Sequence, residues 1–339
     1  CTDRCRWEDS VQGTLRQLSM KTNKIVGFVT SLLTVAVFVS AHTQESEEVL
    51  ERIRSARTIA GSQWAVAADY FCKKGAVTPN QNADPVLEPM KIFDNLYFIG
   101  RTGTVVYAIT TPNGIILIDS GYIDDLETVL MPGMDHLGLD PARIEYVIIA
   151  HGHADHFGGA AYLQEQYGAR IVMGASDWDL LERASVEGSL SVPAPDRDLI
   201  AMDGGSISLG GVEVTTIFIP GHTPGSLGLI FPVKDGEITH RAALFGGTIL
   251  NPTRITNEGL KQYRDSIENF SQYAWDMKVD VEIQNHPLYD EMQNKISLLK
   301  TRGTGARHPF VVGQEAYQTF LDVMSECTKV EQARRAAVQ

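Results

Sequence analysis

The sequence predicts an α/β protein in which two packed β-sheets carry helices on both outer faces, an αββα sandwich. Two observations predict this fold. Short apolar and β-branched runs gather in two clusters, at 95–150 and at 206–246, and helical stretches follow each cluster. The chain has 339 residues, 43% of them hydrophobic and 21% charged, so it is long enough for one large or two small cores.

The first cluster predicts an antiparallel meander and then a buried strand. Three apolar runs occupy 95–100, 105–110 and 114–119, and the turn sequence Pro112-Asn113-Gly114 separates the last two. The β-branched run at 144–150 is typical of a buried strand. The other elements predicted in this half are a helix at 124–137, a helix at 159–168, a strand at 171–173 and a helix at 175–184.

The second cluster repeats this order of strands followed by helices. The strands are predicted at 206–210, 213–219, 226–232 and 241–246. The elements that follow are a helix at 259–275, a strand at 279–284 and helices at 289–302 and 313–331. No short-period repeat is found, so residues 91–339 are predicted to form one domain.

Residues 42–90 are predicted as an N-terminal helix and a linker. The stretch 45–70 has helical composition and is expected to cover the outside of the main domain. The stretch 73–89 contains Pro79, Pro85 and Pro89 among polar residues, which indicates irregular chain.

The segment 20–41 resembles a secretory signal peptide. Lys21 and Lys24 precede a diluted apolar run, and Val39-Ser40-Ala41 has the small residues of a cleavage site. We therefore expect residues 1–19 to be upstream, non-native sequence and the mature protein to be periplasmic or secreted, with no stable membrane association after cleavage. A buried helix and an N-terminal membrane anchor are the alternatives.

Four cysteines are present, and two of them, Cys1 and Cys5, fall in the segment expected to be upstream sequence. Cys72 and Cys327 would then be the cysteines of the mature chain. In an oxidising compartment a disulfide between them is a natural hypothesis, and two unpaired thiols are the alternative.

The charge balance excludes one class of partner. The formal net charge is -13, which gives no electrostatic basis for binding a polyanion. The expected partner is a small-molecule substrate, and no nucleic acid is expected.

Four metal-ligand side chains follow the predicted strand 144–150 within six residues: His151, His153, Asp155 and His156. Extended backbone turns the first two to the same side, and a turn can bring the other two onto a neighbouring ion. A solitary histidine is usually structural, whereas three with an aspartate at this spacing indicate a metal site.

This spacing resembles the HxHxDH motif of the metallo-β-lactamase superfamily. His222, in Gly221-His222-Thr223-Pro224-Gly225-Ser226, and His286, in Asn285-His286-Pro287, resemble that family's remaining ligands. The resemblance implies two Zn²⁺ ions per chain in a catalytic domain spanning 91–339. The implied ligands are His151, His153 and His222 for the first ion and Asp155, His156 and His286 for the second.

The implied chemistry is hydrolysis. Two zinc ions with open coordination positions can acidify a shared water near neutral pH, and Asp155 would also orient that nucleophile. Asp119 follows the meander and is predicted to organise the ligands from behind, with a plain turn aspartate as the alternative. Iron or manganese would also suit such a donor set.

Gly247 stands where many relatives in the superfamily carry a bridging aspartate, so the sequence is most similar to the third subclass of metallo-β-lactamases. The implied reaction is opening of the β-lactam amide. The alternatives are a hydrolase of another ester, lactone or thioester, and a non-enzymatic zinc-binding module.

Thr248 keeps a hydroxyl that could meet a substrate carboxylate, and Arg254 could pair with one. Asn251, Tyr289 and Trp178 are predicted as pocket-lining residues from position alone. Leu250 has no hydroxyl where that subclass often places a serine, and an exposed arginine is usually only solvated. The histidines expected on the surface or in loops are His42, His136, His240 and His308.

Overall fold

The computed structural model describes residues 45–75 and 79–337. The expectations for residues 1–19, for the signal peptide at 20–41 and for His42 therefore lie outside the described residues. Across the described ranges, none of the helices combines the length and the hydrophobicity needed to cross a membrane.

The first sheet has seven strands in the order β1-β2-β3-β4-β5-β6-β7. Their bounds are β1 (Met90–Phe93), β2 (Leu96–Gly100), β3 (Val105–Thr111), β4 (Gly114–Ile118), β5 (Ile144–Ile148), β6 (Arg170–Met173) and β7 (Leu199–Ile200). The strands β2 to β4 form the predicted antiparallel meander, β1 adds a further antiparallel strand to it, and β4 to β7 pair in parallel.

The second sheet has five strands in the order β12-β11-β10-β9-β8. Their bounds are β8 (Gly205–Leu209), β9 (Val212–Phe218), β10 (Leu227–Asp235), β11 (Ile238–Phe245) and β12 (Val281–Glu282). Pairing is antiparallel except between β11 and β12.

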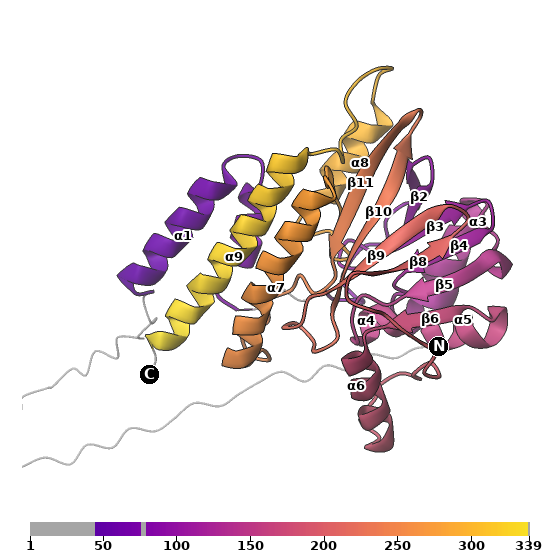
Figure 1. The fold of residues 1–339 in the computed structure, drawn as a ribbon, viewed down its shortest axis with the longest axis horizontal. Coiled ribbons are helices and arrows are strands. Elements are labelled where there is room, and N and C mark those ends of the chain that lie inside the picture. Colours follow the sequence, from indigo (N-terminus) through magenta and orange to yellow (C-terminus); the bar gives the residue numbers. More distant parts are fainter. Residues whose placement is uncertain (1–44, 76–78, 338–339) are drawn as a thin grey trace, which may run out of the picture. The chain divides into compact units, whose positions relative to one another are not determined.

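Helices cover the outer face of both sheets. Their bounds are α1 (Glu47–Ala60), α2 (Ala65–Phe71), α3 (Met131–His136), α4 (Ala154–Phe157), α5 (Ala160–Tyr167), α6 (Ala175–Val186), α7 (Asn257–Asp276), α8 (Met292–Lys300) and α9 (Gln314–Ala336). On the second sheet, α9 lies between α1 and α7 (Figure 1). The predicted αββα sandwich is confirmed.

Strands buried on both faces explain the apolar runs in the sequence. Along β3, Tyr107 belongs to the core between the sheets, whereas its neighbours Val106 and Ala108 belong to the core beneath the outer helices. Along β10, Phe231 faces the inner core and Ile230 faces the helices α7 and α9. Because alternate residues point to opposite faces, such strands lose the alternation of polar and apolar residues.

The N-terminal segment differs from the single helix predicted at 45–70. It forms α1 and α2, because Gly61 ends α1 at a φ of 56° that favours glycine. Both helices pack on α9, and a disulfide joins Cys72 to Cys327. Of the two alternatives for these cysteines, a disulfide or two unpaired thiols, the structure contains the disulfide.

Several boundaries also differ from the predictions. The strand β1 lies at the end of the expected linker, and the short strand β7 was not predicted. The predicted helix at 124–137 is a 3₁₀ turn (Ile123–Asp125), a π turn (Leu126–Leu130) and then α3. Pro132 lies at the start of α3 and has no N–H for the preceding turn, which accounts for the irregular helix.

Candidate metal centre

Loops at the ends of strands carry the predicted ligands. His151 and His153 lie after β5, and Asp155 and His156 lie in the short helix α4. His222 lies in the loop between β9 and β10, and His286 lies after β12. Gly221, just before His222, has a φ of 138°, and a Cβ there would lie 2.5 Å from the Tyr263 Cα. Only glycine therefore fits this turn.

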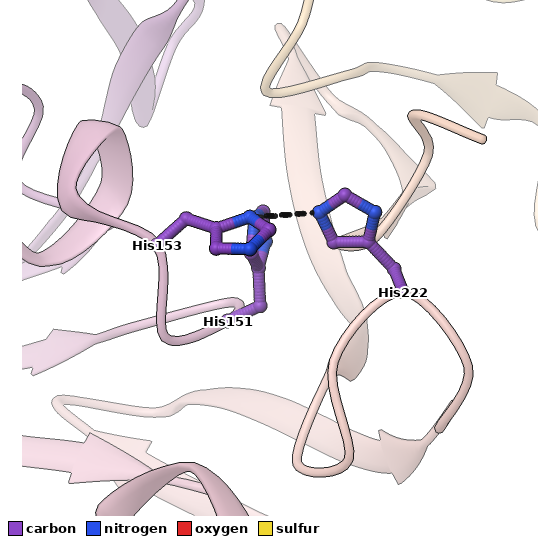
Figure 2. Close-up of side chains that lie close together, drawn as sticks. All are labelled: His151, His153 and His222. Atoms are coloured by element: carbon purple, nitrogen blue, oxygen red, sulfur yellow. Dashed lines mark hydrogen bonds between the residues drawn. The ribbon is translucent and has the colours of Figure 1, made fainter. Parts of the chain in front are cut away.

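The first ligand cluster consists of His151, His153 and His222. The His222 Nε2 lies 3.1 Å from the His151 Nε2 and 3.0 Å from the His153 Nδ1. Figure 2 shows the His222 ring pointing from its loop toward the rings of His151 and His153. Two nitrogens held at about 2.0–2.1 Å by one tetrahedral ion lie roughly 3.3 Å apart, so this spacing fits a metal site.

The second ligand cluster consists of Asp155, His156 and His286. The His156 Nε2 lies 3.1 Å from the His286 Nε2 and 3.2 Å from the Asp155 Oδ2. The Asp155 Oδ2 lies 3.9 Å from the His286 Nε2. His151 also lies within reach of this cluster, since its ring centroid is 3.9 Å from that of His156. The structure thus brings all six predicted ligands together, and their binding of zinc stays a prediction.

Protonation differs between the two clusters. Burial lowers the pKa of His151, His153 and His222, which keeps these imidazoles in the neutral form that binds a metal. Burial also lowers the pKa of His286, to about 4. Burial opposes the charge on His156, but the carboxylates of Asp155 and Asp119 raise its pKa to about 10.

Hydrogen bonds behind the ligands fix their orientation. The His222 Nδ1 is 2.6 Å from the Ile249 carbonyl oxygen, and the His286 Nδ1 is 2.8 Å from that of Gly103. When one ring nitrogen of a neutral histidine donates its N–H to a carbonyl, the lone pair of the other nitrogen is free to bind a metal. Both Nε2 atoms therefore face the site.

Asp119 is in contact with the second cluster from behind. Its Oδ2 lies 2.7 Å from the His156 Nδ1, and its Oδ1 accepts a hydrogen bond of 2.8 Å from the Ala150 backbone N–H. The Asn285 side-chain amide also donates to the Oδ2, at 3.2 Å. This position agrees with the organising role expected for Asp119.

A cavity of about 440 Å³ opens over the ligands. Its wall consists of Pro79, Tyr122, His153, Ala154, Asp155, His222, Ile249, Asn251, Arg254, Ile255 and His286. Asn251 and Arg254 therefore lie where a substrate contact was predicted. Arg254 is exposed, and within the described residues its guanidinium has no carboxylate partner.

The predicted cavity positions of three residues are wrong, because none of them lines this cavity: Thr248, Tyr289 and Trp178. Thr248 is fully buried, and its hydroxyl lies within hydrogen-bond distance of Gln284 Oε1 and of the Phe245 carbonyl oxygen, to one of which it donates. The Tyr289 ring is buried and stacks on Phe71 of α2. The Trp178 ring lies under the first sheet, with its Nε1 donating to the Leu199 carbonyl.

The remaining histidines have local roles. His136 is exposed, and the His240 Nδ1 lies 2.6 Å from Asp280. His308 lies in a loop as expected, but it is buried, stacks on Phe93 and bonds to the Ile92 carbonyl.

Five wall residues were missed: Pro79, Tyr122, Ala154, Ile249 and Ile255. Tyr122 follows the Asp119-Ser120-Gly121 turn directly, so its place beside the ligands could have been inferred, and burial raises its pKa to about 12. Pro79 belongs to the stretch expected to be a linker, and nothing in its local sequence indicates that it reaches the cavity.

Comparisons with known proteins agree with this geometry. Residues 99–239 match the model of the metallo-β-lactamase superfamily. The solved structure of BJP-1, a subclass B3 metallo-β-lactamase of Bradyrhizobium japonicum, is 28% identical with a TM-score of 0.66, covering 76% of this chain and 98% of that one. The native FEZ-1 metallo-β-lactamase from Legionella gormanii has a TM-score of 0.66 at 22% identity, covering 75% and 98% of the two chains, and shows the fold.

Curated relatives match over shorter stretches. A hydroxyacylglutathione hydrolase of Acidiphilium cryptum is 34% identical over 89 residues, which is 26% of this chain and 31% of the relative. The matches span 33%, 48% and 31% of the length of three such relatives.

Proposed function

We propose that this chain, a metallo-hydrolase that contains a domain of the metallo-β-lactamase superfamily, is a two-zinc β-lactamase. The observation that carries the proposal is the three-plus-three ligand set around one cavity. The match to BJP-1, which covers 98% of that chain and 76% of this one at 28% identity, supports it.

The donor set fits zinc. His151, His153 and His222 would hold one ion, and Asp155, His156 and His286 the other, each with an open position. When bound, the ions would supply a water of lowered pKa and polarise the scissile carbonyl. Asp155 would orient the attacking water, since its carboxylate faces the cavity.

Gly247 supports a site without a bridging carboxylate. A Cβ at this position would lie 2.7 Å from the His222 Cβ and 3.1 Å from the Ser226 Oγ. Any larger side chain at 247 would therefore displace the His222 ring.

Arg254 supports a substrate that carries a carboxylate, as β-lactams do. The chain has a formal net charge of -13, yet this exposed arginine stands in the cavity wall beside His153 and Asn251. A guanidinium without a protein carboxylate partner is available for a planar anion.

A hydrolase of another ester, lactone or thioester is the second candidate. The 34% identity to a hydroxyacylglutathione hydrolase favours it, although that match ends well short of both full lengths.

A substrate panel tests the proposal. Protein of measured zinc content is assayed with penicillins, cephalosporins and carbapenems beside lactones and thioesters, with the His222→Ala variant as the inactive control. We expect β-lactam hydrolysis that requires zinc. Efficient cleavage of a lactone or thioester, with no turnover of any β-lactam, would replace the proposal by the second candidate.

Secretion or residence in the periplasm is part of this proposal. The Cys72–Cys327 disulfide supports it, because disulfides persist in oxidising compartments. N-terminal sequencing of the exported protein tests it, with a start at His42 as the expected result.

A further inference from the structure

Asp177 is a buried carboxylate outside the ligand set. It lies in the first turn of α6 and is fully buried, although its helix covers the first sheet and not the cavity. An aspartate in such a place needs several hydrogen bonds to offset the loss of water.

The carboxylate joins the two loops that carry the first ligand cluster. Its Oδ2 accepts a hydrogen bond of 2.7 Å from the Gly152 backbone N–H, and Gly152 lies between His151 and His153. The same oxygen accepts from the Thr223 hydroxyl at 2.6 Å, one residue after His222.

The other oxygen completes the link. The Asp177 Oδ1 accepts a hydrogen bond of 2.8 Å from the Gly225 backbone N–H. The Thr223 hydroxyl also lies 2.7 Å from the Ser226 Oγ, which accepts from the Thr223 backbone N–H at 3.1 Å. The loop after His222 is thus closed on itself and tied to Asp177.

The surrounding glycines make room for this side chain. A Cβ on Gly225 would lie 2.5 Å from the Asp177 backbone nitrogen, and one on Gly152 would lie 3.3 Å from the Asp177 Oδ2. A Cβ on Gly174, the N-cap of α6, would lie 2.3 Å from the Gly225 carbonyl oxygen. Three glycines from three segments therefore allow the loops to approach one carboxylate closely.

We propose that Asp177 is a positioning residue for the first metal site: it sets the separation of the His151–His153 loop from His222 without touching any of the three imidazoles. Hydrogen bonds to an ionised carboxylate are stronger than neutral ones, so they hold both loops in one register. The inference rests on the proposed function only in that the three histidines bind a metal.

Asp177→Asn tests the inference, because the amide keeps the volume of the carboxylate and removes one acceptor. Zinc affinity is measured by chelator competition in two backgrounds. His286→Ala isolates the first ligand cluster, and His222→Ala isolates the second. We expect Asp177→Asn to weaken zinc binding roughly 10–100-fold in the first background and to leave it unchanged in the second.

Asp179→Asn is the matched control, since Asp179 lies on the same helix, is exposed and pairs with Arg197 at 2.7 Å. It should change neither affinity. Thermal unfolding of the metal-free proteins shows whether Asp177→Asn folds. If it does not, Thr223→Val removes one of the three hydrogen bonds and should weaken the first site several-fold.

Equal loss in both backgrounds would mean that Asp177 only stabilises the fold, and no loss in the first would also overturn the inference. Zinc affinity does not depend on the substrate, so a chain that fails to hydrolyse β-lactams can still bear out the role of Asp177.

Discussion

The two ligand clusters lie side by side, but the protein holds them in different ways. The first cluster contains three neutral imidazoles. The carboxylate of Asp177 supports this cluster only indirectly, because it accepts hydrogen bonds from the backbone of the ligand loops. The second cluster contains its own carboxylate, and Asp119 contacts the His156 ring directly. An ion bound in the first site would therefore have only neutral ligands, whereas an ion in the second site would have the negatively charged carboxylate of Asp155.

The loop that carries His286 has an additional anchor. Lys295 of α8 is buried, and its Nζ lies 2.6 Å from the Glu282 Oε2 and 3.0 Å from the Asp290 Oδ2. These two carboxylates stand four residues before and four residues after His286. The lysine thus ties both ends of the loop to one helix.

Removing one histidine from each cluster should have the largest effect and separates the two clusters most sharply. We expect His222→Ala to lose one zinc and all detectable hydrolysis, because the first site would bind and polarise the substrate carbonyl. We expect His286→Ala to lose the other zinc and to retain weak activity. Zinc content and turnover measured on the same samples test this. Unchanged zinc content in both variants would contradict the assignment of ligands.

Lys295→Met should have the next largest effect, on stability. It would leave two buried carboxylates without their cation, and breaking a buried ion pair in this way costs about 3–5 kcal/mol. Urea unfolding of the metal-free protein measures the change. Lys300→Met is the control, because Lys300 forms an exposed pair with Glu88, and we expect it to change the free energy of unfolding by less than about 1 kcal/mol. Equal effects would show that the buried cluster is not an anchor.

Asp119→Asn should weaken zinc binding at the second site roughly 10–100-fold, because it removes the carboxylate that orients His156. Asparagine tolerates the φ of 63° at this position, so the turn itself should remain. Zinc affinity in the His222→Ala and His286→Ala backgrounds measures the effect at each site, and the exposed Asp124→Asn serves as the control. A loss of zinc affinity confined to the first site would contradict the assignment of Asp119 to the second cluster.

Arg254→Ala should have the smallest effect. We expect KM for a β-lactam to rise about two- to fivefold with kcat little changed, since an exposed ion pair contributes roughly 0.4–1 kcal/mol. Steady-state kinetics measure it. A β-lactam with an esterified carboxylate is the control, because its KM should not respond to the substitution. An equal rise for both substrates would exclude the proposed contact.

Short-range patterns carried most of what could be predicted. His151, His153, Asp155 and His156 lie within six residues after a buried strand, so their chemistry shows in the sequence. The αββα order also shows, because strands and helices alternate in long, regular groups.

Long-range packing decided the rest. Thr248 points to Gln284 and Tyr289 stacks on Phe71, and neither partner is visible from the residues around them. The role of Asp177 could not be predicted for the same reason, since its three hydrogen-bond donors belong to two loops that are distant in the sequence. Positions that depend on partners far along the chain need the fold before they can be interpreted.

The Cys72–Cys327 bond closes a covalent ring around the whole hydrolytic unit. The two cysteines are 255 residues apart, and both sheets and all six ligands lie between them. A protease that cuts a surface loop inside this ring would leave the two fragments joined, so they would separate on a denaturing gel only after reduction. A force applied outside the two cysteines would pass through the sulfur bridge and leave the sandwich unstretched.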